Sequence, residues 1–260
     1  MEKFLRGKDI IRLSQAEPVS MADEWFEIAS VDHFWMTWRF KALERLIKRF
    51  GLLRNGQRFL EIGCGHGQFM LQSDSYLPVV TDGCDLNLYA LEKIGDTKGD
   101  VYVYDITQQH PDMVGKYDGI FLLDVIEHIE DDVEFLSFAK KHCKPGAIVV
   151  INVPALMALH SRYDMVAGHK RRYTISDIEN LFDDVGLETI YVGYWGMLLI
   201  PIAVVRKFVL RFVSPKKIID TGFSPRSKWV NSLFKGLMSI ELSLNGKIPL
   251  GTSVLAIARV

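Results

Sequence analysis

Three glycines at alternate positions follow a short apolar segment, in the part of the chain whose residue types best suit ligand binding. Gly63, Gly65 and Gly67 come directly after residues 59–62 (FLEI). Glycines at such a turn let the backbone bend tightly and approach a ligand where a Cβ atom would collide. The spacing G-x-G-x-G differs from the dinucleotide pattern, because residue 68 is Gln, and the Gly-Lys-Ser/Thr ending of a phosphate-binding loop is missing.

Acidic residues stand at the ends of the next three predicted strands. Asp85 lies 18 residues after Gly67, close to the ~20-residue interval at which an acidic side chain can accept hydrogen bonds from ribose hydroxyls. Asp105 and Asp124 end the two strands after that. Carboxyl ends of parallel strands share one edge of a sheet, so we expect these carboxylates to surround one ligand. The four strands are predicted over residues 59–62, 78–84, 101–104 and 117–123.

These four motifs, in this order, resemble the cofactor site of class I S-adenosylmethionine-dependent methyltransferases. Residues 122–131 (LLDVIEHIED) are similar to the branch that includes the ubiquinone-type and type 11–12 methyltransferases. The resemblance covers about residues 30–195. It implies an α/β fold: a seven-stranded Rossmann-like sheet with helices on both faces, whose last strand lies antiparallel between the fifth and the sixth.

The resemblance also implies S-adenosyl-L-methionine as cofactor and a role for each matched residue. Asp85 binds the two ribose hydroxyls, and Asp105 meets the adenine amino group. Asp124 closes the pocket near the sulfonium, and Glu61 anchors the glycine loop. The other implied cofactor residues are Gly63, Cys64, Gly65 and Gly67 beside the methionine, Leu86 and Ile106 beside the adenine, and Arg39 at the cofactor carboxylate.

The composition is typical of a globular cytoplasmic enzyme. Hydrophobic residues make up 48% and charged residues 24% of the 260 residues. A net charge of −1 argues against a general nucleic-acid binder. The three cysteines lack C-x-x-C spacing, so neither a disulfide framework nor a zinc site is expected. The first residues show no apolar segment of a secretory signal, which favours a cytoplasmic protein.

The chain is expected to form one methyltransferase domain over residues 1–260. Its parts are an N-terminal helical cover (1–50), the cofactor-binding core (57–195), a helical cap inserted before the last strand (196–250), and that strand (251–260). Helices are predicted over residues 37–50, 86–94, 131–143 and 174–186, and the later strands over 147–153, 188–194 and 253–260.

A long connection over residues 154–173 is the first candidate for acceptor binding, because long loops at this sheet edge often bind ligands. Its G-H-x-R-R-Y segment resembles bacterial methyltransferases found with surface-saccharide and secondary-metabolite genes. Cations beside a histidine are suited to a phosphate or carboxylate, and a solvated basic turn is the alternative. The candidate substrate residues here are His160, Arg171, Arg172 and Tyr173.

The segment before the first long helix is the second candidate. In related enzymes it folds over the cofactor, so His33 or Trp35 is predicted to face the acceptor. The alternative is an aromatic segment that only covers the core. The third candidate is residues 196–213, an apolar run with basic residues. It is too short and too interrupted to span a bilayer, and it suits a peripheral membrane contact, a lid or a homodimer interface equally well. Residues 229–244 also predict an amphipathic helix.

Methyl transfer from a sulfonium is an in-line displacement that needs alignment and exclusion of water. A base is needed only when the acceptor must lose a proton, and His128 and His169 are the candidates. No metal site is expected. The favoured function is methylation of a hydroxyl or amine on a small-molecule, sugar or lipid-linked acceptor. An NAD-dependent oxidoreductase and a non-enzymatic binding module are the alternatives.

Overall fold

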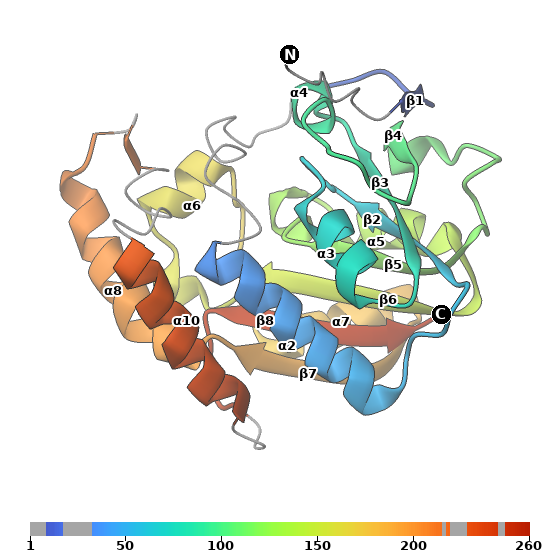
Figure 1. Ribbon diagram of the computed structural model, residues 1–260. Coiled ribbons are helices and arrows are strands. Elements are labelled where there is room, and N and C mark those ends of the chain that lie inside the picture. Colours follow the sequence, from blue (N-terminus) through green and yellow to red (C-terminus); the bar gives the residue numbers. More distant parts are fainter. Residues whose placement is uncertain (1–8, 18–32, 215–216, 219–227, 244–247) are drawn as a thin grey trace, which may run out of the picture.

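The computed structural model describes residues 9–17, 33–214, 217–218, 228–243 and 248–260. Its centre is an eight-stranded sheet in the order β1-β4-β3-β2-β5-β6-β8-β7 (Figure 1). The strands are β1 (Ile10–Arg12), β2 (Arg58–Ile62), β3 (Val80–Asp85), β4 (Val101–Val103), β5 (Tyr117–Leu123), β6 (Cys143–Pro154), β7 (Glu188–Trp195) and β8 (Ser253–Arg259).

The order of the strands confirms the expected Rossmann-like sheet and corrects the number of its strands. Strands β1 to β6 pair in parallel, while β8 runs antiparallel between β6 and β7 as expected. The seven-strand expectation was wrong by one, because β1 pairs with the outer edge of β4, with Ile10 opposite Val101. This pairing satisfies backbone groups that an open edge would expose. Three residues carry too short a pattern to show it in the sequence.

Helices cover both faces of the sheet (Figure 1). The α-helices are α2 (Phe34–Phe50), α3 (Gln68–Tyr76), α4 (Leu88–Leu91), α5 (Asp132–Lys141), α6 (Arg162–Ala167), α7 (Ile175–Val185), α8 (Ile200–Val209) and α10 (Lys228–Ser243). Short 3₁₀ turns are η1 (Ile106–Gln108), η2 (Ile126–His128), η3 (Met157–Leu159), η4 (Met197–Leu199) and η5 (Leu210–Phe212).

Alternating side chains of the strands feed two core clusters, one on each face. Leu60 and Ile120 point to the cluster that contains Leu136 of α5 and Phe182 of α7. The neighbouring residues Phe59 and Phe121 belong instead to the cluster formed with α2, α3 and α10. Since successive side chains of a strand point to opposite faces, burial on both sides explains why these strands are almost continuously apolar.

The predicted helix bounds agree best with the structure where the sequence carries capping residues at both ends of the helix. Helix α7 has the expected start and end: Thr174 and Asp177 form a capping box, and Gly186 takes the left-handed conformation. The helix expected over 86–94 is only the four residues of α4. The connection over 154–173 is not an open loop, because Ser161 and Asp164 form a second capping box that starts α6.

None of the helices in the described ranges is both long and apolar enough to cross a membrane.

Candidate functional site

A cavity of about 310 Å³ lies where β2, β3, β4 and β5 end. The predicted cofactor residues that line it are Arg39, Glu61, Gly63, Cys64, Gly65, Asp85, Leu86, Asp105, Ile106 and Asp124. Lining residues that the sequence analysis did not identify include Met36, His66, Gln68, Phe69, Tyr104, Ile129 and Phe135. Met36 and Phe135 come from helices that reach the strand ends only after folding, whereas His66, Gln68 and Tyr104 are sequence neighbours of predicted site residues.

The three glycines have different structural roles. Gly63 and Gly65 line the cavity, with φ of 73° and 53°, in the region that favours glycine. A Cβ atom on Gly63 would lie 2.6 Å from Cγ2 of Val125, so the turn must pass close to the end of β5. Gly67 is not among the lining residues. It begins α3 with φ of 74°, and a Cβ there would meet Ile94 at 3.0 Å.

Asp85 connects the glycine loop to the second strand of the site. Its carboxylate accepts hydrogen bonds of 2.8 Å from the backbone N–H groups of Gly65 and Asn87. Burial raises the pKa of Asp85, and these N–H groups act in the opposite direction because they stabilise the charged form. The carboxylate is therefore held at the cavity wall by the main chain, with its remaining lone pairs available to a ligand.

Asp105 begins η1 in a similar way. Its Oδ1 accepts hydrogen bonds from the backbone N–H and the hydroxyl of Thr107, at 2.9 and 2.7 Å. Among the described residues, its Oδ2 accepts only a long contact of 3.4 Å from Gln108. A strand-end carboxylate thus again lines the cavity with one oxygen fixed by the local turn.

Asp124 has a left-handed backbone (φ 63°), and its carboxylate is held by two side chains. Arg39 of α2 donates a hydrogen bond of 2.7 Å to its Oδ2, and Asn152 of β6 donates one of 2.9 Å to its Oδ1. The Nε1–H of Trp195 donates in turn to Asn152 at 2.8 Å. Burial raises the pKa of Asp124, and the charge of Arg39 opposes this. The sequence analysis assigned no role to Asn152 or Trp195.

Glu61 is a buried carboxyl group that faces the cavity. Burial raises its pKa to about 8, the positive charge of Arg39 lowers it, and Asp85 adds to the rise. Among the described residues its Oε2 has no hydrogen-bond partner. A buried, unsatisfied oxygen of this kind is costly unless a ligand or water supplies a donor, so it is a natural contact for a ligand amine or hydroxyl.

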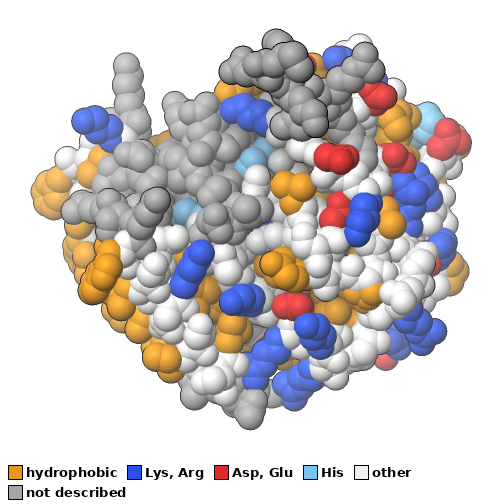
Figure 2. Space-filling model, viewed as in Figure 1, with side chains coloured by type: hydrophobic (Ala, Val, Ile, Leu, Met, Phe, Trp, Pro, Cys, Tyr) orange, Lys and Arg blue, Asp and Glu red, His pale blue; other side chains and the backbone are white. Residues whose placement is uncertain are grey.

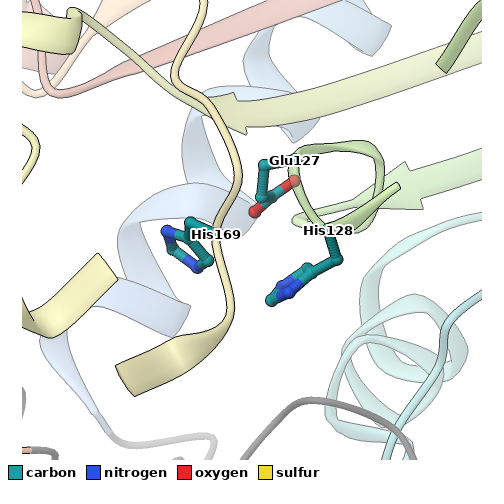
Figure 3. A group of neighbouring side chains, drawn as sticks. All are labelled: Glu127, His128 and His169. Atoms are coloured by element: carbon teal, nitrogen blue, oxygen red, sulfur yellow. The ribbon is translucent and has the colours of Figure 1, made fainter. Parts of the chain in front are cut away.

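Glu127, His128 and His169 lie close to one another, as Figure 3 shows. One oxygen or nitrogen of each lies within 4.8 Å of the others, and the two imidazole rings are nearly perpendicular with centroids 4.9 Å apart. Burial raises the pKa of Glu127 well above its usual range, and neighbouring Asp124 adds to this. Burial, assisted by His169, lowers the pKa of His128 to about 4. Only His128 of the three lines the cavity.

This cluster could hold a proton or a cation. A carboxylate and two imidazoles are suitable ligands for a transition metal, although the burial that raises the pKa of Glu127 disfavours the charged form that binds a cation. Neither Glu127 oxygen has a hydrogen-bond partner among the described residues. The sequence analysis expected no metal and did not single out Glu127. Its position next to the predicted base His128 is the sequence feature that could have identified it as a site residue.

Asp164 fixes the orientation of the His169 ring through a contact with its Nδ1 atom. It is fully buried and accepts a hydrogen bond of 3.0 Å from Nδ1 of His169. Arg172 pairs with the same oxygen at 2.7 Å, and Ser161 donates its backbone N–H to the other. Burial alone would raise the pKa of Asp164, but His169 and the charge of Arg172 hold it well below its usual range. Because an ionised carboxylate only accepts, Nδ1 carries the proton and Nε2 of a neutral His169 is an acceptor.

The other predicted substrate residues are not in the cavity lining. Arg171 pairs with Asp132 at 3.1 Å, and the Tyr173 hydroxyl donates to the same carboxylate at 2.7 Å. His160 lies 3.5 Å from the carbonyl oxygen of His169. Arg171 and Tyr173 therefore fasten the loop to the segment after β5, while Arg172 pairs with Asp164 inside the connection itself.

The N-terminal candidates lie at the start of α2. His33 caps this helix, since its Nδ1 accepts a hydrogen bond from the backbone N–H of Trp35 at 3.2 Å. The Trp35 ring stacks 5.1 Å from the guanidinium of Arg39. Of these three side chains, Arg39 reaches the cavity lining.

Comparisons with known proteins agree with this geometry. The family model of the methyltransferase domain matches residues 35–192. Phosphoethanolamine N-methyltransferase 2 of Caenorhabditis elegans is 34% identical over 117 residues, which are 42% of this chain and 26% of that protein. The chain thus spans about a quarter of the length of this curated relative.

Solved structures show the same fold at low identity. A protein from Galdieria sulphuraria, described as a putative sarcosine dimethylglycine methyltransferase, superimposes with a TM-score of 0.59 at 15% identity over 86% of each chain. Phosphoethanolamine N-methyltransferase 2 of Haemonchus contortus, in complex with S-adenosyl-L-methionine, gives a TM-score of 0.55 at 21% identity, over 84% of this chain and 52% of that chain.

Proposed function

Because this chain belongs to the methyltransferase domain family, whose members use S-adenosylmethionine, we propose that it transfers a methyl group from S-adenosyl-L-methionine to a hydroxyl or amine. The acceptor is a small-molecule, sugar or lipid-linked compound. Membership of the family confirms the expectation of a methyltransferase. It disfavours the alternatives of an NAD-dependent oxidoreductase and of a non-enzymatic module.

One observation carries the proposal: the bare glycine turn and the strand-end carboxylates line a single cavity. Asp85 would hold the ribose hydroxyls, and Asp105 would lie at the adenine. The unsatisfied oxygen of Glu61 would accept from the amino-acid part of the cofactor. These residues fit the group because each offers an acceptor or an open main-chain surface.

When bound, the cofactor supplies a methyl group on a positively charged sulfur, which leaves as a neutral thioether once the acceptor has taken the methyl. The chain's own residues must align the acceptor and remove its proton. His128 is the residue best placed to accept that proton, since it lines the cavity and its lowered pKa of about 4 keeps it unprotonated at neutral pH.

His169 supports His128 in this proposal. The ionised carboxylate of Asp164 holds the ring through its Nδ1, and the ring lies next to Glu127 and His128. Because the two ring centroids are only 4.9 Å apart, the fixed His169 ring would limit the orientation of His128. Asp164 acts as a positioning residue and does not itself reach the cavity lining.

Two observations bear on the acceptor. The relative from C. elegans is named as an N-methyltransferase, which supports an amine. The resemblance of residues 122–131 to ubiquinone-type enzymes supports a hydroxyl. The basic loop does not favour a phosphate, because Lys170, Arg171 and Arg172 are paired with Glu130, Asp132 and Asp164.

Calorimetry with S-adenosylhomocysteine tests the proposal directly. The wild-type chain is expected to bind it, and Asp85→Ala is expected to abolish binding. Asp112→Ala, at an 86% exposed side chain, is the matched control and should bind normally. Binding of NAD with no response to S-adenosylhomocysteine would overturn the proposal in favour of the oxidoreductase. Radiolabelled methyl transfer to panels of alcohols and amines then identifies the acceptor class.

A further inference from the structure

The helical cap before the last strand presents large apolar side chains to solvent. No side chain of helix α8 is fully buried. The exposed apolar residues of α8, η5 and α10, which we call the docking face, are Val204, Val205, Phe208, Val209, Phe212, Trp229, Leu233 and Ile240. Phe212 is 91% and Trp229 77% exposed. Figure 2 shows hydrophobic side chains gathered along the margin where Figure 1 draws α8 and α10.

The inner faces of the same helices are already used. Ile202 of α8 and Met238 and Leu242 of α10 pack in the core cluster around Trp195. Glu241, the only acidic residue of α10, is buried and accepts the backbone N–H groups of Gly196 and Leu198 at 2.5 and 3.0 Å. The helices are therefore held in place, and the docking face is what remains after they have packed.

The turn that follows α8 is hydrogen-bonded to the connection after β6. Nη1 of Arg162 donates to the carbonyl oxygens of Leu210 and Val213 at 3.0 and 2.9 Å. Lys207 donates to the carbonyl oxygen of Ala158 at 2.7 Å. Phe212 therefore lies in a turn that is held to the rest of the protein by hydrogen bonds.

The charge of this surface is of one sign. Residues 197–212 contain Arg206, Lys207 and Arg211 and no acidic residue. Arg211 is exposed, and its guanidinium lies 5.0 Å from the centre of the Phe208 ring. Among the described residues of α8, η5 and α10, no acidic side chain is exposed. An apolar stripe that carries the exposed cation Arg211 and, among the described residues of these helices, no exposed carboxylate is complementary to lipid chains beneath anionic headgroups.

We propose that the docking face binds the surface of an anionic lipid bilayer, with Phe212 and Trp229 inserted among the acyl chains and Arg211 among the headgroups. This inference goes beyond the proposed methyl transfer and does not depend on it. A second copy of the chain is a poorer occupant, because a twofold contact would place Arg211 against a face whose described residues offer no exposed carboxylate. Aromatic side chains at the rim of such a face are typical of interfacial binding.

Sedimentation with sucrose-loaded vesicles tests the proposal on the full chain. The wild type should sediment with vesicles of phosphatidylcholine and phosphatidylglycerol, and much less with phosphatidylcholine alone. The double variant Phe212→Ser/Trp229→Ser should lower the partition coefficient by at least about tenfold. Arg211→Glu should weaken binding to the anionic vesicles only. Tyr76→Ser, at a 65% exposed aromatic residue of α3, is the matched control and should behave as the wild type.

Two results would overturn the proposal. One is equal sedimentation of the wild type and the double variant with anionic vesicles. The other is a wild-type dimer in light scattering that the double variant converts to a monomer, which would identify a second copy as the occupant. Far-ultraviolet circular dichroism and S-adenosylhomocysteine binding of each variant verify that the fold and the cavity are intact.

Discussion

Arg39 and Asp124 form an ion pair of 2.7 Å at the carboxyl ends of the strands, and their side chains are only 6% and 19% exposed. Arg39 belongs to the helix that precedes the first core strand, and Asp124 follows β5. The pair therefore fastens the N-terminal helix over the carboxyl ends of the strands. Because both residues also line the cavity, the same contact closes one of its walls.

Removal of Arg39 should destabilise the protein strongly. Arg39→Met leaves the buried Asp124 without its cation, so the free energy of unfolding should fall by about 3–5 kcal/mol. Urea titration measures this. Arg49→Met, on the exposed side of the same helix, should change it by less than about 0.5 kcal/mol. Equal losses in the two variants would show that the ion pair contributes little.

Asp85→Asn should weaken cofactor binding more than it weakens folding. The amide retains the shape but loses the charge that strengthens hydrogen bonds to hydroxyls, so affinity for S-adenosylhomocysteine should fall on the order of 100-fold. Calorimetry gives the affinity and thermal unfolding the stability. A variant that binds as the wild type does would refute the assignment of Asp85 to the ribose.

Glu61 should make the stability of the cofactor-free protein decrease as pH rises. Its pKa is raised to about 8 from an ordinary 4.5, so its contribution is fully present below about pH 4.5. That contribution declines as the unfolded chain ionises and is lost by about pH 8. The loss is up to about 3–5 kcal/mol, at 1.36 kcal/mol per pKa unit.

Urea unfolding of the wild type and Glu61→Gln at pH 5 and 8 measures this effect. The difference in stability between the two proteins should change with pH, in favour of the variant at pH 8. Parallel pH profiles would mean that Glu61 is ionised in the folded state.

His128→Asn should lower the rate of methyl transfer by 10²–10⁴-fold, the usual contribution of a general base. Because the base form of His128 persists down to about pH 4, the wild-type rate should show no His128 titration between pH 6 and 8. His110→Asn, outside the cavity lining, is the control. A full rate in His128→Asn would remove the base from the mechanism.

Chelators should leave the activity unchanged. Burial raises the pKa of Glu127 well above its usual range, which disfavours the charged carboxylate that binds a cation, so the cluster with His128 and His169 should work without a metal. The rate after treatment with EDTA tests this. Glu127→Gln preserves a neutral polar side chain and should retain most of the activity. Loss of activity in both experiments, with rescue by a divalent cation, would establish a metal site instead.

The strand-end carboxylates and the glycine turn were within reach of the sequence. They depend on local rules: an apolar run forms a strand, glycine permits the turn, and parallel strands end at the same edge. Helix α7 was predictable for the same reason, because Thr174, Asp177 and Gly186 specify its ends within the helix itself.

The environment of the predicted histidines and of the basic loop was decided by tertiary structure. Nothing in the sequence distinguished Asp164 from a surface residue. Only the folding of α6 brings it to His169 and Arg172. Glu127 meets His169 because segments more than 40 residues apart pack together, with Lys170 donating its backbone N–H to the carbonyl oxygen of Glu127. Ionic and imidazole groups have many partners of suitable chemistry along a chain, and burial against one particular neighbour selects among them.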